Sequence, residues 1–460
     1  MENQPDSRNI NGASNEAGGE ASVQPNAADG ADIAQELTEQ SPESAENLND
    51  ADINAENPSE SDSESKPHRT VKLRTAIISC AAFLLAGVLM TLLVVPNPLR
   101  MWIGGSSALD KLSSLESIIK QNYIYADEID DDDMADMLAW GYVYGLGDKY
   151  SVYYDAEQYE SLRQSNAGVT YGIGVSVVMY EEKGGMYIVR VTNGSPAQAA
   201  GLLKGDIITA VEGTGVTSDN YSEMLENIRG EKDTEVSLTV LRGDSVTEVK
   251  VTRGEYTSDS VNGNMIGTSG YIQITTFNET TKTQFNDVLD SLIADGADSL
   301  IIDLRGNLGG LVEAATDVLD RLLPEADLAY AVYNDGTKKV LGKSDAACID
   351  LPIAVLVDGN SASSSEYCAS ALRDIGGAVL VGSKTFGKGI MQSTYPLGDG
   401  SAVRVTVAEI YTAAGTRYHG IGLSPDVEAG YTDEQRPHWF LLEGEDDPYI
   451  AASLKALGKQ

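Results

Sequence analysis

The sequence predicts a multidomain α+β protein in which a disordered tail and a single transmembrane helix precede a helical segment, a β domain and an α/β core. Three observations predict this order: a polar N-terminal stretch, an unbroken apolar run after it, and a change from alternating strands to strand-and-helix repeats near residue 254. The predicted parts are a tail at 1–66, a transmembrane helix at 75–95, a helical region at 104–168, a β domain at 170–253, an α/β core at 254–430 and a C-terminal segment at 431–460.

The tail is acidic and rich in Asn, Ala, Ser and Gly. Up to about Ser65 it has no aromatic residue, and Arg8 is its single basic residue. Such a segment buries too little apolar area to offset the entropy of ordering, so it is predicted to be disordered. The net charge of the whole chain is −38, and no basic face is visible. Nucleic acid is therefore not expected as a partner, because phosphate binding needs such a face.

The apolar run from 75 to 95 contains no charged residue. At about 1.5 Å per residue it forms a helix about 31 Å long, close to the roughly 30 Å hydrocarbon core of a bilayer. A cleaved signal peptide is the alternative, but its apolar region is usually shorter, and here a long tail precedes it. By the positive-inside rule the tail is cytoplasmic and the rest of the chain extracytoplasmic. The basic residues before the run are Lys66, Arg69, Lys72 and Arg74, and Arg100 follows it.

The chain has three cysteines. Cys80 lies inside the apolar run, which leaves Cys348 and Cys368 as the one possible intramolecular disulfide. The sequence leaves open whether that bond forms. Cys368 falls on an apolar helix face, which favours a buried thiol.

The β domain contains glycine turns in a characteristic order. Tyr171, Gly172, Ile173 and Gly174 precede short alternating strands, and a Gly-Leu-Leu-Lys-Gly-Asp turn lies within 195–208. Over about 80 residues this arrangement resembles a PDZ domain. The resemblance implies a groove that takes an extended peptide by strand addition and holds its C-terminal carboxylate on the backbone N–H groups of residues 171–174.

A candidate nucleophile follows the apolar strand that ends at Val357. Ser363 lies in a turn of small residues that leads into a helical pattern at 367–372. A hydroxyl at a strand-to-helix turn is exposed at a sheet edge, and the helix N-terminus behind it favours a developing oxyanion. Ser361, Ser364 and Ser365 surround it, and the sequence alone does not exclude them.

A serine nucleophile needs a base. A free lysine titrates near about 10.4 and must be desolvated before it can act as one. Lys388 lies between Gly387 and Gly389 and is the first candidate. Lys384 and His419 are the alternatives.

These motifs together resemble the carboxy-terminal processing proteases, which are serine peptidases with a Ser–Lys dyad on a crotonase-like α/β core. The resemblance implies that Ser363 is the nucleophile, Lys388 the general base and Gln392 the residue that orients it. It also implies oxyanion donors among the backbone N–H groups of Gly309, Gly310 and Ser364. Leu308 and Ser364 stand where the family often has proline and alanine. The motifs that carry the resemblance lie at 145–151, 303–310, 361–366 and 384–392.

The predicted function is hydrolysis of peptide bonds near the C-termini of protein substrates, outside the membrane. The predicted partners are proteins or peptides with free C-termini and the membrane through one helix, and the sequence leaves open whether a second copy of the chain binds. No metal or organic cofactor is expected. One alternative is a membrane-tethered PDZ scaffold with an inactive peptidase unit. Another is acyl-CoA chemistry on the crotonase-like sheet, which the expected extracytoplasmic location disfavours.

Overall fold

The computed structural model describes residues 107–459, so the predicted tail and transmembrane helix lie outside the described residues. Within 107–459, no helix is both long enough and apolar enough to span a bilayer. The chain divides into two units, which meet in the sequence between residues 138 and 139. The candidate site residues all belong to the second unit, which runs to the C-terminus.

The segment predicted to be helical contains three α-helices and one short strand. The acidic run 130–133 forms a helix start, because three aspartates fall in the first turn of α4, where the helix dipole favours negative charge. Strand β1 was not predicted, since its extended form depends on pairing with a strand some 250 residues later, where Val152 lies opposite Arg404. The elements are α3 (Ser107–Asn122), η1 (Ala126–Glu128), α4 (Asp131–Tyr144), β1 (Val152–Tyr154) and α5 (Ala156–Asn166).

The β domain is built on an antiparallel sheet in the order β3-β4-β5-β7-β8, with β6 beside β5. Its inward side chains form one core that includes Ile188, Ile208 and Leu238. A separate pair, β2 with β9, closes the domain at its two chain ends. The elements are β2 (Val169–Gly172), β3 (Val175–Tyr180), η2 (Glu181–Lys183), β4 (Gly185–Val191), α6 (Pro196–Ala199), β5 (Ile207–Val211), β6 (Thr214–Gly215), α7 (Tyr221–Arg229), β7 (Glu235–Arg242), β8 (Ser245–Thr252) and β9 (Gly254–Thr257).

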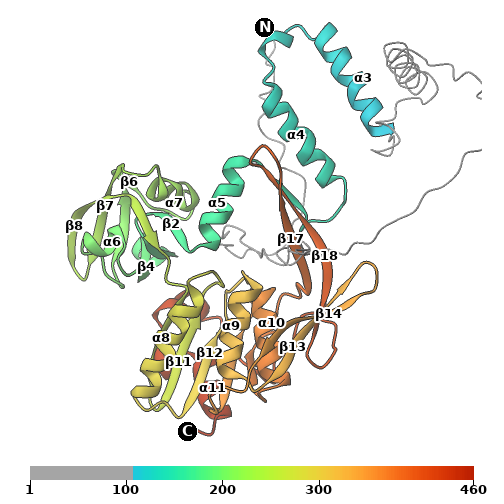
Figure 1. Ribbon diagram of the computed structural model, residues 1–460. Coiled ribbons are helices and arrows are strands. Elements are labelled where there is room, and N and C mark those ends of the chain that lie inside the picture. Colours follow the sequence, from blue (N-terminus) through green and yellow to red (C-terminus); the bar gives the residue numbers. More distant parts are fainter. Residues whose placement is uncertain (1–106, 460) are drawn as a thin grey trace, which may run out of the picture. The chain divides into compact units, whose positions relative to one another are not determined.

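The α/β core contains a sheet in the order β10-β11-β12-β15-β16-β19, parallel from β11 onward. Its strands and helices alternate along the chain (Figure 1), as the sequence pattern predicts. The elements are β10 (Val261–Ile266), β11 (Ser269–Ile274), α8 (Thr281–Ala294), β12 (Ser299–Asp303), α9 (Val312–Leu322), β15 (Ile353–Val357), α10 (Ser364–Asp374), β16 (Val379–Gly382) and β19 (Val427–Glu428).

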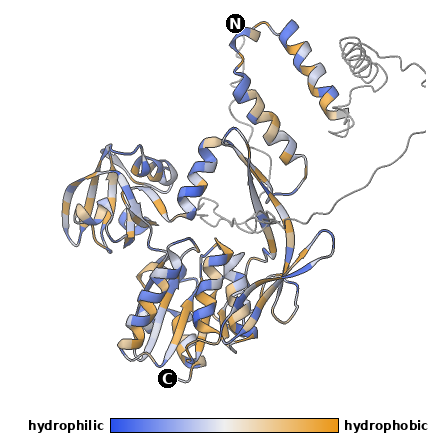
Figure 2. Cartoon of the chain, viewed as in Figure 1, coloured by the Kyte–Doolittle hydropathy of each residue, from blue (hydrophilic) through white to orange (hydrophobic). Residues whose placement is uncertain are grey.

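Both faces of this sheet are covered, which explains why β12 and β15 are fully buried. One face packs with α8, α9 and α10 around Ile302 and Val355. The other packs with the C-terminal helix α11 (Pro448–Ala456) around Ile301 and Leu356. Figure 2 shows hydrophobic strands between helices whose outer faces are hydrophilic.

The register places three loops at one sheet edge. Asp303 at the end of β12 lies opposite Leu356, and Val357 at the end of β15 lies opposite Gly382 of β16. The carboxyl ends of parallel strands meet at the same edge, where sites usually form. The turn 304–310, the turn 358–363 and the segment after β16 therefore lie side by side.

A second sheet, which the sequence reading did not predict, is built around the long strand β18. It pairs with β17 on one edge, and with β1 and β13 on the other. Its elements are β1, β13 (Ala326–Tyr333), β14 (Lys338–Ser344), β17 (Ile390–Pro396) and β18 (Ala402–Thr412). The C-terminal segment adds η3 (Arg436–Leu441) and η4 (Gly444–Asp446) before α11.

Cys348 and Cys368 are both free, so no disulfide joins them. Cys348 is half-buried and Cys368 is fully buried on α10, which confirms the buried thiol predicted from the helix pattern. Burial raises the pKa of the Cys368 thiol to about 12.

We expect Cys368 to resist alkylation in the folded protein, because the thiolate is the reactive form and burial suppresses it. Peptide mapping after iodoacetamide treatment should find Cys348 modified and Cys368 protected, and both modified after unfolding in guanidinium. Equal labelling of the two cysteines in the folded chain would contradict the buried position of Cys368.

Candidate active site

Ser363 lies immediately before α10 in a backbone conformation that L-residues rarely adopt. Its φ is 56° and its ψ −118°, and among the described residues only two other non-glycine residues have positive φ. Such a conformation costs about 1–3 kcal/mol and persists where the surroundings impose it. The residue is 7% exposed. A strained serine between a buried strand and a helix is the arrangement of a nucleophile elbow.

The three serines around Ser363 have structural roles. Each donates its hydroxyl to a backbone carbonyl of the neighbouring loop 304–310, and so ties the serine turn to that loop. The bonds run from Ser361 to Leu304 (2.8 Å), from Ser364 to Gly310 (2.7 Å) and from Ser365 to Asn307 (2.8 Å). This geometry favours Ser363 as the nucleophile among the four.

The buried carboxylate of Glu366 joins the serine turn to the lysine segment. Its Oε2 accepts the backbone N–H groups of Ser363 (3.1 Å) and Lys388 (2.7 Å). Its Oε1 accepts the N–H of Gly387 (2.7 Å) and the hydroxyl of Thr385 (2.5 Å). Because two N–H groups share one oxygen, the backbones at 363 and 388 lie within two hydrogen-bond lengths of each other.

Burial raises the pKa of Glu366, while the hydrogen bonds from Thr385, Gly387, Lys388 and Ser363 act in the opposite direction. The sequence reading missed this residue. A signal was present, since Ser-x-x-Glu at a helix start is the spacing of a capping box. The capping-box spacing predicts the hydrogen bond from the Ser363 N–H to Glu366, but it does not predict the bonds from Gly387 and Lys388.

The structure distinguishes the candidate bases by burial. Lys388 is 9% exposed, whereas Lys384 is an exposed side chain. Gln392, on β17, is 6% exposed, and its Nε2 has no hydrogen-bond partner among the described residues. Its predicted role in orienting Lys388 therefore stays a prediction. His419 is half-buried, and its backbone packs against Gly389.

The segment 145–151 lies beside the lysine. The Nζ atom of Lys388 is 5.3 Å from the centroid of the Tyr150 ring, a cation–π distance. Asp148 fixes this segment, because its Oδ2 accepts the hydroxyls of Thr406 on β18 (2.7 Å) and Ser151 (2.6 Å). Burial would raise the pKa of Asp148, but these hydrogen bonds outweigh it and the pKa is lowered.

The glycine turn packs directly against the serine turn. A Cβ on Gly309 would lie 2.8 Å from the Cβ of Ser363, and one on Gly310 would overlap the carbonyl oxygen of Phe277. Both glycines have positive φ. The N–H of Gly309 donates to Asn307 Oδ1 (2.8 Å), so this predicted oxyanion donor is engaged within its own loop. The corresponding roles of Gly310 and Ser364 stay predictions.

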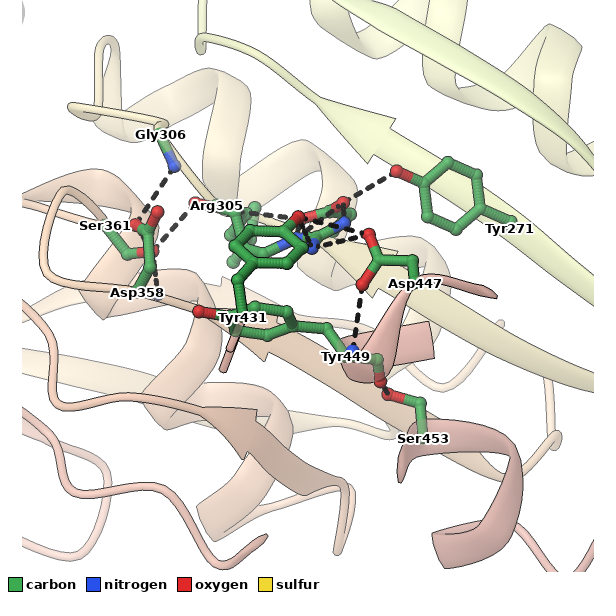
Figure 3. A network of polar contacts seen from close by, with 11 residues as sticks. Tyr271, Arg305, Gly306, Asp358, Ser361, Tyr431, Asp447, Tyr449 and Ser453 are labelled. Carbon is green, nitrogen blue, oxygen red and sulfur yellow. Dashed lines mark hydrogen bonds and ion pairs between the residues drawn. The ribbon is translucent and has the colours of Figure 1, made fainter. Parts of the chain in front are cut away.

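A buried ionic network supports the loop that carries these glycines (Figure 3). Arg305 donates to Asp303 (Nη2–Oδ2, 2.6 Å), to Asp447 (Nη1–Oδ2, 2.9 Å) and to the hydroxyl of Tyr431 (2.9 Å). Tyr271 donates to Asp303 Oδ2 at 2.6 Å. Burial alone would lower the pKa of Arg305, but Asp303 and Asp447 outweigh it and hold the pKa well above its usual range.

Asp447 connects this network to the C-terminal segment. Its side chain caps α11 by accepting the Tyr449 N–H (2.8 Å), while its other oxygen binds Arg305. The sequence reading assigned no role to residues 431–460. In the structure this segment packs on the sheet face opposite α8, α9 and α10, and its Asp447 supports the loop 304–310 through Arg305.

Of the four residues predicted to bind a peptide carboxylate, Tyr171 and Gly172 end β2, and Ile173 and Gly174 connect β2 to β3. Ile173 is buried, and Gly172 and Gly174 have positive φ, as a tight loop requires. Within the described residues β3 pairs only with β4, and α7 lies on its other side, where the Tyr221 hydroxyl donates to Val177 O (3.1 Å). This is the edge at which a PDZ domain adds a peptide strand.

The fold and the site define a peptidase core joined to a PDZ domain. The sequence pattern of peptidase family S41 matches residues 268–429, and that of the PDZ domain matches 172–252. The chain is 36% identical over 333 residues to carboxy-terminal processing protease CtpA of Bacillus subtilis (strain 168), covering 72% of this chain and 70% of that protein.

A carboxyl-terminal-processing protease of Picosynechococcus sp. is 36% identical over 322 residues, covering 68% of this chain and 76% of the relative. An S41 protease structure from Bacteroides fragilis NCTC 9343 shares the fold, with a TM-score of 0.53 at 16% identity over 75% of this chain and 96% of that one. The chain belongs to the carboxy-terminal processing proteases of peptidase family S41 and is a serine-type endopeptidase. The family resemblance predicted from the motifs is confirmed.

We expect Glu366→Gln to lower activity at least tenfold and the free energy of unfolding by about 1–3 kcal/mol, because an amide group cannot accept all four donors and leaves buried N–H groups unpaired. Peptidase assays on the folded protein and chemical denaturation measure the two effects. Glu428→Gln, at an exposed position on β19, is the matched control. Wild-type activity in Glu366→Gln would show that the shared carboxylate does not hold the site together.

We expect Asp447→Asn to lower the melting temperature and the turnover number, because Arg305 loses one of its two carboxylate partners in a buried site. The adjacent Asp446→Asn is the control, since Asp446 is exposed. Thermal unfolding and steady-state kinetics on both variants give the comparison. Equal effects of the two substitutions would exclude a specific role for the Arg305 contact.

Proposed function

We propose that this chain is a membrane-anchored peptidase that cleaves protein substrates near their C-termini with a Ser363–Lys388 dyad. The observation that carries the proposal is the carboxylate of Glu366, which binds the backbone N–H groups of both residues at one oxygen. The burial of Lys388 and the strained backbone of Ser363 support the same assignment. The alternative base Lys384 is exposed, in contrast to the buried Lys388.

In the proposed reaction the Ser363 Oγ attacks the scissile carbonyl carbon while neutral Lys388 takes its proton. Lys388 then gives the proton to the leaving amine as the C–N bond breaks, and an acyl-enzyme remains. Water attacks this ester while the lysine accepts a proton from it, and the lysine returns that proton to the Ser363 Oγ as the ester C–O bond breaks and the carboxylic acid product leaves. The start of α10, with the Ser364 N–H, stabilises the oxyanion together with Gly310, and Gln392 orients the lysine.

The PDZ domain binds the substrate tail in this proposal. The loop 171–174 receives the C-terminal carboxylate, and the edge of β3 beside α7 receives the extended chain. Deletion of residues 170–253 tests this role through a loss of preference for substrates with free C-termini.

The membrane anchor in the proposal is the apolar run 75–95, with the acidic tail in the cytoplasm and the catalytic part outside. The support comes from the length of the run and from the basic residues before it. Protease protection of intact cells or spheroplasts, read with antibodies against each end of the chain, tests this topology.

We expect Ser363→Ala and Lys388→Ala each to abolish cleavage of an unfolded protein or of a peptide with an apolar C-terminus. The control is Lys384→Ala, which should retain activity because Lys384 is exposed. Circular dichroism confirms that each variant is folded. Turnover that survives Lys388→Ala would move the base to Lys384 or His419. Peptide binding without cleavage in the wild type would favour the scaffold alternative.

A further inference from the structure

Within residues 107–459, one face of the β17–β18 hairpin carries four buried polar side-chain atoms without a hydrogen-bond partner. They are Gln392 Nε2, Thr394 Oγ1, and the Nε and Nη1 atoms of Arg404. Gln392 pairs with Thr406, and Thr394 pairs with Arg404. Residues opposite each other in a ladder, and residues two apart along a strand, share a face. Buried polar groups are nearly always bonded, so four on one face require an explanation.

Arg404 is the most demanding of these groups. It is 5% exposed, and none of the described carboxylates forms a salt bridge with it. Its neighbour is the ring of Tyr154 on β1, with the guanidinium carbon 5.2 Å from the ring centroid. The carboxylate of Asp148 reaches this face but accepts the hydroxyls of Thr406 and Ser151. A guanidinium is always charged and is costly to bury without an anion.

The face begins at the proposed catalytic residues. Gln392 follows Lys388 by four residues, and Thr394 and Arg404 lie one two-residue repeat further along the hairpin, about 7 Å away at the usual strand rise. A peptide that leaves the scissile bond along this hairpin therefore reaches Arg404 within a few residues. We take the part that meets the guanidinium to be the C-terminal side, which becomes the leaving fragment, because that side ends in a carboxylate and the buried guanidinium lacks an anion among the described residues.

We propose that Arg404, with Thr394 and Gln392, forms a binding subsite for the C-terminal carboxylate of the substrate's leaving fragment. A carboxylate supplies acceptors for these donors and also neutralises the buried guanidinium, which a neutral carbonyl does not. This subsite is separate in sequence from the PDZ loop, and it lies on the hairpin that carries Gln392. The inference rests on the proposed peptidase function.

The test uses the full chain and short peptides of one sequence that end in a free acid, in an amide, or in an amide that follows aspartate. We expect the wild type to cleave the acid at least tenfold better than the plain amide in kcat/KM. Arg404→Gln should reduce this ratio to near one, and Thr394→Val should reduce it less. Arg417→Gln, an exposed arginine paired with Glu409, is the control and should keep the ratio.

The outcomes separate the subsite from the proposed function. If the wild type cleaves none of the peptides, the proposed function fails. The subsite is then tested separately by calorimetry, which compares the affinities of the wild type and Arg404→Gln for the acid and amide fragments. An acid-to-amide ratio that is unchanged in folded Arg404→Gln overturns the inference and assigns the preference to the PDZ domain. Full cleavage of the aspartate amide also overturns it, because the ligand would then be an acidic side chain.

Discussion

The site depends on a single buried carboxylate that holds the serine turn to the lysine segment, two parts of the chain that the register of β15 and β16 brings to the same sheet edge. Glu366 comes three residues after the candidate nucleophile and accepts N–H groups from both the serine turn and the lysine segment. Each of these N–H groups would be unpaired without it, so the bonds are costly to break. The separation between Ser363 and Lys388 is therefore set at the backbone, before any side chain adopts a rotamer.

A second set of contacts, the ion pairs of Arg305, fixes the glycine loop 304–310 and involves the C-terminal segment. Arg305 binds Asp303, which ends a buried strand, and Asp447, which caps the last helix. The same loop is bound from the serine side by the hydroxyls of Ser361 and Ser365. The loop is thus held at several points along its length, as preorganised donors for an oxyanion require. The C-terminal segment is part of this support although it lies far away in the sequence.

Local sequence signals were sufficient for the central sheet and the serine turn. The apolar runs at 299–303 and 353–357 predict buried parallel strands, and the structure has strands at these positions. The pairing of strands that lie far apart in the sequence could not be predicted from it. Strand β1 is three residues long and exists through its pairing with β18. The sequence of β18 alternates, with Val403, Val405 and Val407 separated by Arg404 and Thr406, but this alternation does not say which strands pair with it.

The unfavourable features of this molecule are concentrated where the chemistry is proposed. Ser363 has a strained backbone, Glu366 is a carboxylate with a raised pKa, and Arg404 is a buried cation without an anion. Each lowers the stability of the free protein, and the apolar layers on both faces of the central sheet offset that cost. Proteins depart from local rules chiefly at functional sites. The departures here differ in kind, because the hydrogen bonds of Glu366 and the turn around Ser363 are formed within the described chain, whereas Arg404 is the group for which we propose a ligand.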